Sequence, residues 1–272
     1  MSTTIRRMTI ADVPVGMRLK ELAGWNQTTA DWQRFLRLQP DGCFLAELDG
    51  QGVGTATAFI FNTVAWIAMV LVDPAYRKHG IGTALMSHAL AFLGDRTVRL
   101  DATALGQPVY AKLGFVGEYE MTRYEGTLAG RGPIATTVRP VSIESERLPF
   151  YRLDQQITGT DRTPLLLELA KGGMRGIGKS GYLMERPGSR ATQIGPAVAC
   201  DEASGLALFN DAACRLAGQP VLLDIPTDNR PAIAWAEAAG LKVQRTFLRM
   251  RRGPAITDQR QQIWAGSGPE KG

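Results

Sequence analysis

The segment RKHGIG at residues 77–82 has the residue types of an anion-binding loop. Gly80 and Gly82 carry no Cβ, so the main chain there can approach phosphate oxygens closely. Arg77 and Lys78 add positive charge, and Thr83 adds a hydroxyl just after the loop. If a helix begins here, its free N–H groups and its dipole also favour an anion. The segment therefore predicts a site for a pyrophosphate group.

The flanking sequence places this loop at a strand-to-helix turn. Residues Val64 to Val72 are almost wholly apolar, as expected of a central strand covered on both faces. From Ile81 apolar residues recur at helical spacing as far as Gly94. Glycines at such a turn also occur in proteins that bind no ligand there, so the two glycines alone do not establish a ligand site. For His79, a place near phosphate is favoured over a role as general base.

Three further motifs make the first half of the chain resemble the GNAT superfamily of N-acetyltransferases. The tripeptide Val72-Asp73-Pro74 precedes Arg77, a Gly-x-Gly begins three residues after it, and Tyr110-x-x-x-Gly114-Phe115 comes later. The resemblance implies acetyl-coenzyme A as the co-substrate. The implied contacts to it are Val70, Leu71, Val72, Arg77, Lys78, His79, Gly80, Ile81, Gly82 and Thr83.

The resemblance also implies how the strand before the loop is used. It diverges from its neighbour, and the pantetheine arm of coenzyme A pairs in the gap like an added strand, at Val70 and Val72. A main-chain N–H, from Leu71 or a neighbour, is directed at the acetyl carbonyl, where negative charge develops during transfer.

Acetyl transfer needs a neutral amine and an acid that protonates the departing thiolate. Tyr110 matches the family tyrosine that acts as this acid, although it could instead only pack against the pantetheine. No clear general base is found, and an ordered water chain is the alternative. Asp101, at the end of a predicted strand, either orients such a water, binds the amine, or caps a helix.

On the acceptor side, the loop Trp25-Asn26-Gln27 joins the first two predicted helices, a connection that borders the acceptor pocket in this family. Trp25 and Trp66 are therefore candidate pocket walls, and core positions are the alternative for both. With Asp101, these four residues form the predicted acceptor set.

The order of elements predicts an α+β protein with two tandem GNAT-like domains, each a mixed, mostly antiparallel sheet flanked by helices. The predicted divisions are a catalytic domain at 1–126, a linker rich in Gly, Pro and Thr at 127–140, a second domain at 141–252 and a tail at 253–272 that could dock. Both halves end alike, since Leu100-Asp101 leads to Gly114-Phe115 and Leu223-Asp224 leads to Gly240-Leu241. This indicates a diverged internal repeat.

The second half resembles the degenerate C-terminal domain of a bacterial tandem subgroup, through LLDIPTDNRPAIAWAEAAGLKV and the terminal GPEKG. Its predicted loop counterpart, Ile194 to Ala197, lacks the arginine and Gly-x-Gly, and Ala236 falls where the tyrosine would be. We therefore expect no coenzyme A binding there. Asp154, Asp161 and Arg162 either face the acceptor or form a solvated charged surface, and the second reading is slightly favoured.

The composition argues against several other classes of protein. The formal net charge is +5, but the basic residues are scattered and no nucleic-acid reader motif is present. Three cysteines and two histidines show no metal-ligand spacing, so we expect no metal, no disulfide framework and a reduced, cytoplasmic setting. No segment has the apolar length of a membrane span.

The leading hypothesis is an enzyme that moves an acetyl group from acetyl-coenzyme A to a primary amine of a small molecule, by direct attack in a ternary complex. A protein or peptide N-acetyltransferase is one alternative, and it would need an open groove. A non-catalytic acyl-coenzyme A-binding regulatory module is the other.

Overall fold

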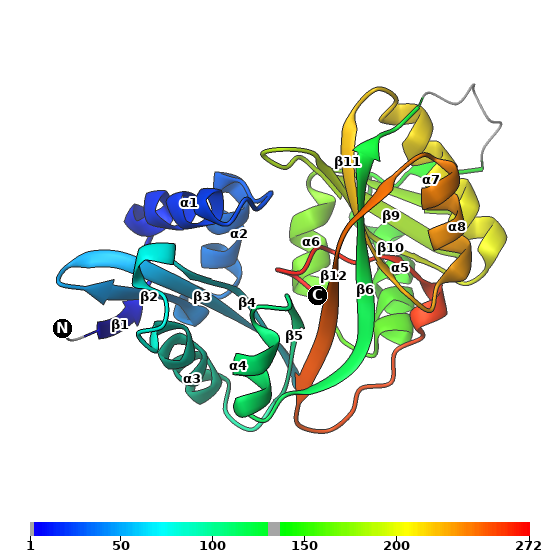
Figure 1. The fold of residues 1–272 in the computed structure, drawn as a ribbon. Helices are drawn as coiled ribbons and strands as arrows, with labels where there is room; N and C mark the ends of the chain where they lie inside the picture. Colours follow the sequence, from blue (N-terminus) through cyan, green and yellow to red (C-terminus); the bar gives the residue numbers. More distant parts are fainter. Residues whose placement is uncertain (1–2, 130–136) are drawn as a thin grey trace.

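The structure, a computed structural model, describes residues 3–129 and 137–272 (Figure 1). Part of the predicted linker, residues 130–136, therefore lies outside the described residues. No helix in the described ranges is long and apolar enough to cross a membrane.

The first half runs in the order strand, two helices, antiparallel meander, helix, strand, helix and strand. Its elements are β1 (Thr3–Arg7), α1 (Val13–Leu22), α2 (Thr29–Leu38), β2 (Cys43–Leu48), β3 (Gln51–Phe61), β4 (Val64–Val72), α3 (Ile81–Leu93), β5 (Thr97–Ala102), α4 (Gln107–Lys112) and β6 (Val116–Thr127). Helices α1 and α2 cover one face of this part of the sheet, and α3 and α4 cover the other (Figure 1).

The second half contains more strands than the sequence suggested. Its elements are β7 (Arg139–Pro140), α5 (Glu144–Thr158), α6 (Thr163–Ala170), β8 (Met174–Ile177), β9 (Gly181–Arg186), β10 (Thr192–Ala199), α7 (Glu202–Arg215), β11 (Pro220–Pro226), α8 (Arg230–Ala238), β12 (Lys242–Arg252) and β13 (Ile263–Ala265). Helix α5 runs through Pro149, which lacks the N–H for one helical hydrogen bond, and it buries Phe150 and Tyr151 directly after it.

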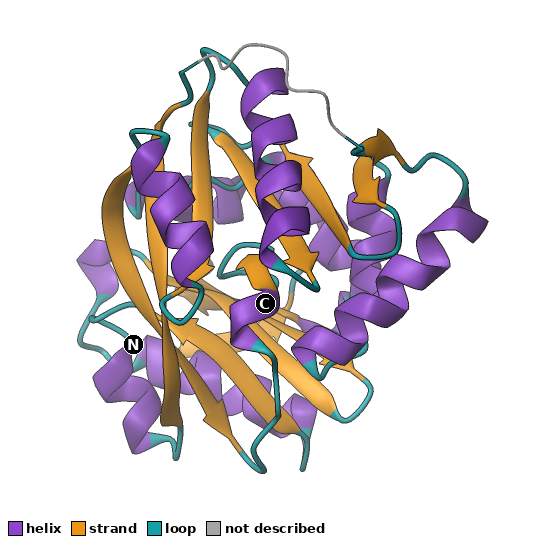
Figure 2. Cartoon of the chain, turned by 90° about the vertical axis from the view of Figure 1, so that its right-hand side faces the viewer, coloured by secondary structure: helices purple, strands orange, loops and turns teal. Residues whose placement is uncertain are grey.

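All thirteen described strands form one mixed, mostly antiparallel sheet, which confirms the predicted α+β class. Its order along the main path is β1-β2-β3-β4-β5-β12-β6-β11-β10-β9-β8-β7, and only β4–β5 and β10–β11 are parallel pairs. Figure 2 shows the strands as a continuous layer with helices packed against it.

The two halves exchange their last strands. Strand β12, from the second half, lies between β5 and β6, while β6, from the first half, lies between β12 and β11 (Figure 1). This exchange places two reciprocal ion pairs at matching register positions. Arg249 donates to both carboxylate oxygens of Asp101 at 2.8 and 2.9 Å, and Arg123 does the same to Asp224 at 2.7 and 2.9 Å. The repeated Leu-Asp of the sequence thus marks equivalent positions in each half.

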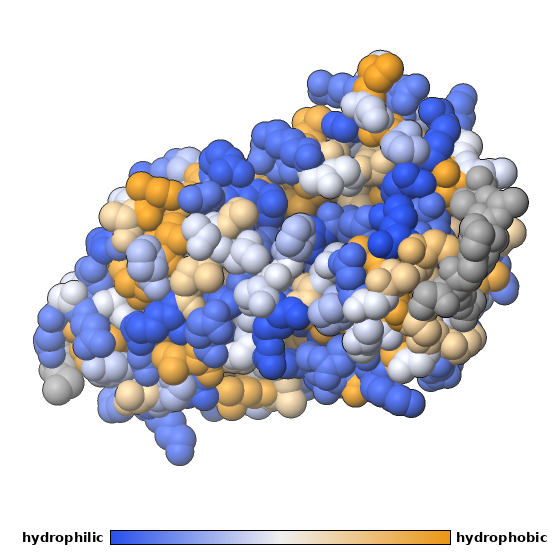
Figure 3. Space-filling view, turned by 90° about the horizontal axis from the view of Figure 1, so that it is seen from above, coloured by the Kyte–Doolittle hydropathy of each residue, from blue (hydrophilic) through white to orange (hydrophobic). Residues whose placement is uncertain are grey.

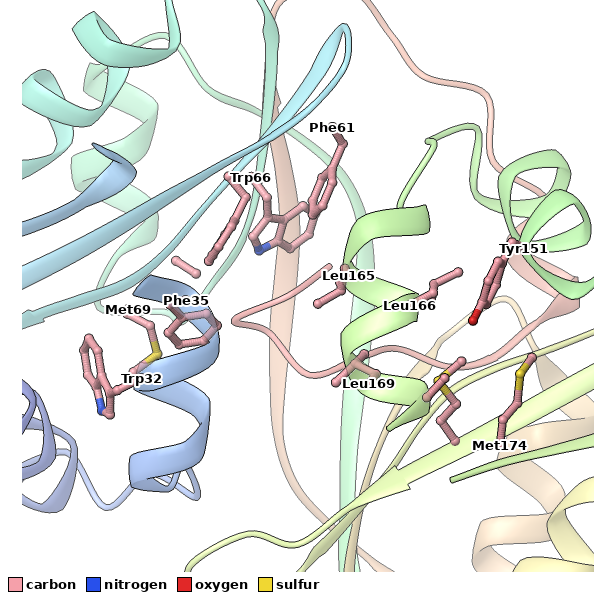
Figure 4. Close-up of a cluster of buried hydrophobic side chains, with 14 of the residues drawn as sticks. Trp32, Phe35, Phe61, Trp66, Met69, Tyr151, Leu165, Leu166, Leu169 and Met174 are labelled. Carbon is pink, nitrogen blue, oxygen red and sulfur yellow. The ribbon is translucent and has the colours of Figure 1, made fainter. Parts of the chain in front are cut away.

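One hydrophobic cluster crosses the junction between the halves. It joins Trp32, Phe35 and Met69 of the first half to Leu165 and Leu169 of α6. Figure 4 shows these α6 leucines on the side that faces Phe35 on α2. The surface seen from above instead carries many hydrophilic residues, with hydrophobic ones in small separate patches (Figure 3). Apolar contact therefore fixes the halves against each other.

The tail inserts into the second half as strand β13. Strands β10 and β11 pair in parallel only from Thr192 to Ile194, and beyond that point β13 pairs with β10. Gly266 continues this insertion, because its N–H donates to Asp224 O on β11 at 2.8 Å. The gap between the diverging strands of the second half is therefore filled by the chain itself.

Trp264 anchors this insertion, and replacing it tests how much the tail stabilises the fold. Its ring is 2% exposed and meets Phe209 edge to face at 5.1 Å. We expect Trp264→Ala to lower the free energy of unfolding by about 3–5 kcal/mol, because a large buried ring is lost, as measured by urea denaturation. An unchanged free energy would contradict this role.

A second substitution checks the same contact from the other side. A Cβ on Gly205 would lie 1.8 Å from Trp264 Cε2. Gly205→Ala should therefore be strongly destabilising in the natural protein and much less so in the Trp264→Ala background, since the obstructing ring is then absent.

Candidate functional site

The N-terminus of α3 is open to an anion. Its N-cap is Gly80, which has φ of 76° and offers no side chain to cap the helix. The N–H groups of Ile81, Gly82 and Thr83 lie in the first turn, where they have no intrahelical partner. Ile81 is buried and fixes the turn to the core, whereas Gly82 is only half-buried. This end of the helix suits a phosphate group.

The loop before the helix supplies charge and exposed side chains. Arg77, Lys78 and His79 are all exposed, and Lys78 adopts φ of 67°. Arg77 Nε donates to Val72 O at 3.3 Å, which holds its side chain beside the end of β4. His79 Nδ1 lies 3.3 Å from Tyr76 O, so the imidazole stays within the loop. All of the predicted loop residues are thus gathered at one helix end.

Strands β4 and β5 diverge next to this loop. They pair in parallel only from Val64 to Trp66, opposite residues 97–99. β5 continues to pair with β12 on its other side as far as Ala102, so in the described part of the chain β4 beyond Trp66 has no strand neighbour on the β5 side. The main chain bends further at Met69, with φ of 51°, where Thr55 Oγ1 donates to Met69 O at 2.9 Å. Val70 follows this bend and lines the opening, whereas the Val72 side chain lies next to Gly82 at the start of α3.

The opening leads into a cleft at the junction of the two halves, which we call the junction cleft. It encloses about 600 Å³ of empty space, including open solvent at its mouth. One wall comes from the first half: Ile67, Ala68, Met69, Val70, Leu100, Asp101, Thr103 and Tyr110. The other wall comes from the α1–α2 loop, strands β6 and β12, and the tail: Trp25, Gln27, Arg123, Arg245, Phe247, Pro269 and Glu270.

Tyr110 lies in the first wall, on α4. Its ring packs over Gly106, where a Cβ would come within 2.6 Å of the ring, so this glycine lets the tyrosine take its place. Burial raises the pKa of Tyr110 to about 12. Its hydroxyl has no hydrogen-bond partner in the described part of the chain, and it is protonated over the working pH range. The group can therefore donate a proton.

The predicted acceptor residues divide into two groups. Trp25 and Gln27 line the junction cleft, whereas Asn26 does not. Asn26 instead binds the second half, since its Oδ1 accepts from the N–H groups of Arg190 and Ala191 at 2.9 and 3.1 Å. Trp66 also lies outside the cleft, and its Nε1–H donates to Pro269 O at 3.0 Å.

Two other predicted residues have specific partners. Asp101 lines the cleft, but both of its carboxylate oxygens are bound by Arg249. It caps no helix, because the N-cap of α4 is Gly106. Leu71 is buried, pairs with Thr55 on β3 and does not line the cleft, whereas its neighbours Met69 and Val70 do.

Comparison with known proteins identifies this arrangement. Residues 17–115 match a family model described as Acetyltransferase (GNAT) family, and residues 150–265 match one described as Acetyltransferase (GNAT) domain. The chain belongs to the GNAT acetyltransferases. It is an N-acetyltransferase with two GNAT domains in tandem, and enzymes of this family generally use acetyl-coenzyme A.

Solved structures agree with the tandem fold. A candidate acetyltransferase from Pyrococcus horikoshii is 25% identical with a TM-score of 0.89, over 99% of this chain and 96% of that one. A tandem GNAT protein from the clavulanic acid biosynthesis pathway is 18% identical with a TM-score of 0.63, over 93% of this chain and 100% of that one.

A curated relative is similar over a shorter stretch. The uncharacterized N-acetyltransferase YitH of Bacillus subtilis (strain 168) is 28% identical over 100 residues, which are 36% of this chain and 36% of that protein. The match therefore spans about a third of the relative's length.

The first GNAT domain fits coenzyme A. The open N-terminus of α3 suits the pyrophosphate, and the gap beside β4 suits the pantetheine arm, which can pair like a strand. A Cβ on Gly80 would meet no described atom within 4 Å, so the loop is open at this residue.

The second GNAT domain has a different loop from the one predicted. Residues 194–197 belong to strand β10, and the turn into α7 is Cys200-Asp201. The predicted loop position was wrong: Ile194 and Ala197 pair with β9, Ala197 also pairs with β13, and Gly195 and Pro196 form an irregularity inside the strand. Asp201 caps α7 through Ser204 N at 2.8 Å. Its carboxylate thus occupies the position where the first domain leaves room for phosphate.

Tyr110 also has a counterpart in the second domain. Phe115 N donates to Tyr110 O at 3.1 Å, and Leu241 N donates to Ala236 O at 3.0 Å, so Ala236 is equivalent to Tyr110. The second domain therefore has only the buried methyl group of Ala236 in place of the tyrosine side chain, and no hydroxyl.

Asp154, Asp161 and Arg162 do not form a solvated surface, and in this respect the favoured reading was wrong. Asp154 and Arg162 are buried and form a two-point ion pair at 2.7 and 3.0 Å. Asp161 Oδ1 accepts from Thr163 N at 3.1 Å. A buried pair of charges fixes the start of α6, which composition alone does not reveal.

Sequence reasoning missed the far wall of the cleft, which consists of Arg123, Arg245, Phe247, Pro269 and Glu270. The terminal GPEKG contains two of these residues, and it was noted only as part of a resemblance. The others lie on the exchanged strands, whose partners cannot be read from local patterns.

Proposed function

We propose that this protein transfers the acetyl group of acetyl-coenzyme A directly to a primary amine of a small molecule in a ternary complex. The observation that carries the proposal is the junction cleft, where the gap beside β4 and the second wall meet. Walls from both halves and from the tail enclose it, which suits a small acceptor better than an extended peptide.

The proposed chemistry uses groups of the first domain. Acetyl-coenzyme A supplies the acetyl group as a thioester. A main-chain N–H at the Met69–Val70 bend polarises the carbonyl while the amine nitrogen bonds to its carbon. Tyr110 gives its proton to the thiolate as the carbon–sulfur bond breaks. Water accepts the proton lost from the amine, since no carboxylate lies on β4.

The second domain, at residues 141–252, is proposed to act as a wall for the acceptor and not as a second enzyme. Asp201 at the start of α7, Ala236 in place of tyrosine, and the β13 insertion each remove one feature that the cofactor would need. Arg245 and Phe247 of β12 are its contribution to the cleft.

A screen of primary amines tests the proposed function. The full chain is incubated with acetyl-coenzyme A and each amine, and thiol release and acetylated product are both measured. Release with matching product is the expected result for at least one amine. Binding of acetyl-coenzyme A without release for any amine would favour the regulatory-module alternative.

A further inference from the structure

Two arginines lie directly opposite each other in the second wall of the junction cleft. Arg123 on β6 and Arg245 on β12 are register partners in neighbouring antiparallel strands. Arg123 is held by both oxygens of Asp224. Arg245 donates through Nε to Gln244 at 3.1 Å, and no carboxylate in the described ranges forms an ion pair with it. Like charges at opposed positions are unfavourable, so Arg245 occupies a costly position.

The surroundings of Arg245 leave its charge partly uncompensated. Burial, and then the charge of Arg123, lower the pKa of Arg245, and Arg190 acts in the same direction, while Asp224 and Glu125 oppose them. Arginine nevertheless stays protonated in proteins. The lowered pKa therefore indicates a cost of holding this cation, and an anion in the cleft would remove that cost.

The same wall carries oxygen atoms that can accept hydrogen bonds. Glu270 is 2% exposed and Gln27 is 4% exposed, and both line the cleft. Glu270 Oε1 accepts from Arg186 and Lys271, whereas Glu270 Oε2 and Gln27 Oε1 have no hydrogen-bond partner in the described part of the chain. A buried acceptor without a partner is costly unless a ligand or water supplies a donor.

Glu270 is suited to binding an amine but not to removing its proton. Burial alone would raise the pKa of its carboxyl, but Lys271 and Arg186 outweigh burial and lower the pKa to about 2. The group is therefore an anion at neutral pH and a weak base.

The phosphate groups of acetyl-coenzyme A cannot be the anion that binds Arg245. The loop at residues 77–83 lies at the other end of the β4 gap, and none of its residues lines the junction cleft. The pantetheine arm between the two places is uncharged. An anionic group next to Arg245 would therefore belong to the acceptor.

We propose that the acceptor is a small amine that also carries an anionic group, which Arg245 binds, while Gln27 and Glu270 receive the amino group. This inference rests on the proposed N-acetyltransferase function. It defines the substrate class as zwitterionic, with a carboxylate or a phosphate as the anion.

Matched pairs of acceptors test the charge requirement. The ω-amino acids from glycine to 6-aminohexanoate are compared with n-alkylamines in which methyl replaces the carboxylate, and 2-aminoethyl phosphate is compared with ethanolamine. We expect kcat/KM to be about 10- to 100-fold higher for the anionic member of at least one pair, as for a hydrogen bond to a charged group. The pair with the larger ratio of kcat/KM values shows whether the preferred anion is a carboxylate or a phosphate.

Substitution of Arg245 tests whether this residue causes the preference. In Arg245→Gln, kcat/KM for the anionic acceptor should fall about 10- to 100-fold, while the matched neutral amine stays within about twofold. Arg245→Lys should restore part of the preference, because the charge returns without the planar fork. Lys242→Gln, an exposed site on the same strand outside the cleft, should keep the natural preference.

Gln27→Met tests the amine end. The substitution removes an unpartnered buried oxygen, so the melting temperature should not fall. If Gln27 receives the amino group, KM for every acceptor should rise about 5- to 20-fold. A KM equal to that of the natural protein would remove Gln27 from the proposal.

The outcomes separate the two levels of inference. If no amine gives thiol release, the proposed function fails. If amines are acetylated but the pairs show equal kcat/KM, or Arg245→Gln lowers both members of a pair equally, only the charge assignment fails.

Discussion

Gly82→Trp should lower kcat/KM for acetyl-coenzyme A at least about 100-fold, a loss of about 2.7 kcal/mol of transition-state stabilisation. Gly82 is the second residue of α3, where free N–H groups are proposed to bind the pyrophosphate. An indole ring there would cover those groups. A Cβ at Gly82 meets only Val72 Cγ2, at 3.7 Å, so the fold itself should tolerate the change. Steady-state kinetics and direct binding of acetyl-coenzyme A measure the effect.

The second domain provides a matched control. Ala203 is the second residue of α7, so it is the equivalent of Gly82, and it is exposed. Ala203→Trp should leave acetyl-coenzyme A binding and turnover unchanged, because Asp201 already occupies the anion position at this helix end. Equal losses in the two variants would mean that both domains bind the co-substrate, and would contradict the single-site proposal.

Tyr110→Phe should lower kcat about 100-fold, within the usual range for loss of a general acid, and leave both KM values within about threefold. The ring would still pack over Gly106 and beside Phe115, so only the proton donor is removed. Rapid-mixing measurement of thiol release distinguishes the rate of the chemical step from the rate of product release. An unchanged kcat would assign Tyr110 a packing role alone.

The pH dependence of kcat/KM is an independent test of the role of Tyr110. Because burial raises the pKa of Tyr110 to about 12, the hydroxyl keeps its proton throughout the neutral and mildly alkaline range. We therefore expect kcat/KM to rise as the acceptor amine loses its proton, with no decrease up to about pH 10. A decrease between about pH 8 and 9 that disappears in Tyr110→Phe would contradict this assignment.

Local sequence was enough to predict the anion-binding loop and the order of elements around it. A turn from a buried strand into a helix is determined by neighbouring residues. The apolar run from Val64 to Val72, the glycines at 80 and 82, and the helical spacing from Ile81 needed no distant partner. The same local logic predicted Tyr110, since its spacing to Gly114-Phe115 lies within one short helix and the strand that follows.

Local patterns did not predict where the second domain turns from its strand into helix α7. Gly195 and Pro196 are typical of a turn, yet they form an irregularity inside β10, because the residues on either side of them pair with β9, which local propensity does not include. Asp201 could have been recognised as an N-cap three residues before Ser204, and it decides that the helix end there is closed to phosphate.

The acceptor side depended on contacts between distant parts of the chain. Asn26 and Gln27 are neighbours in sequence, but Asn26 is bound to the backbone at 190–191 while Gln27 lines the cleft. Which of two adjacent polar residues faces a ligand depends on how the halves pack, and that was not available from either residue alone.

The sequence by itself thus determined the family, the co-substrate loop and the candidate acid, because each is encoded within one or two adjacent elements. Only the tertiary structure decided the exchange of β6 and β12, the insertion of β13, and the wall formed by Arg245 and Glu270. Those features arise from hydrogen bonds and apolar burial between segments that are not adjacent in the sequence, for which local periodicity carries no signal.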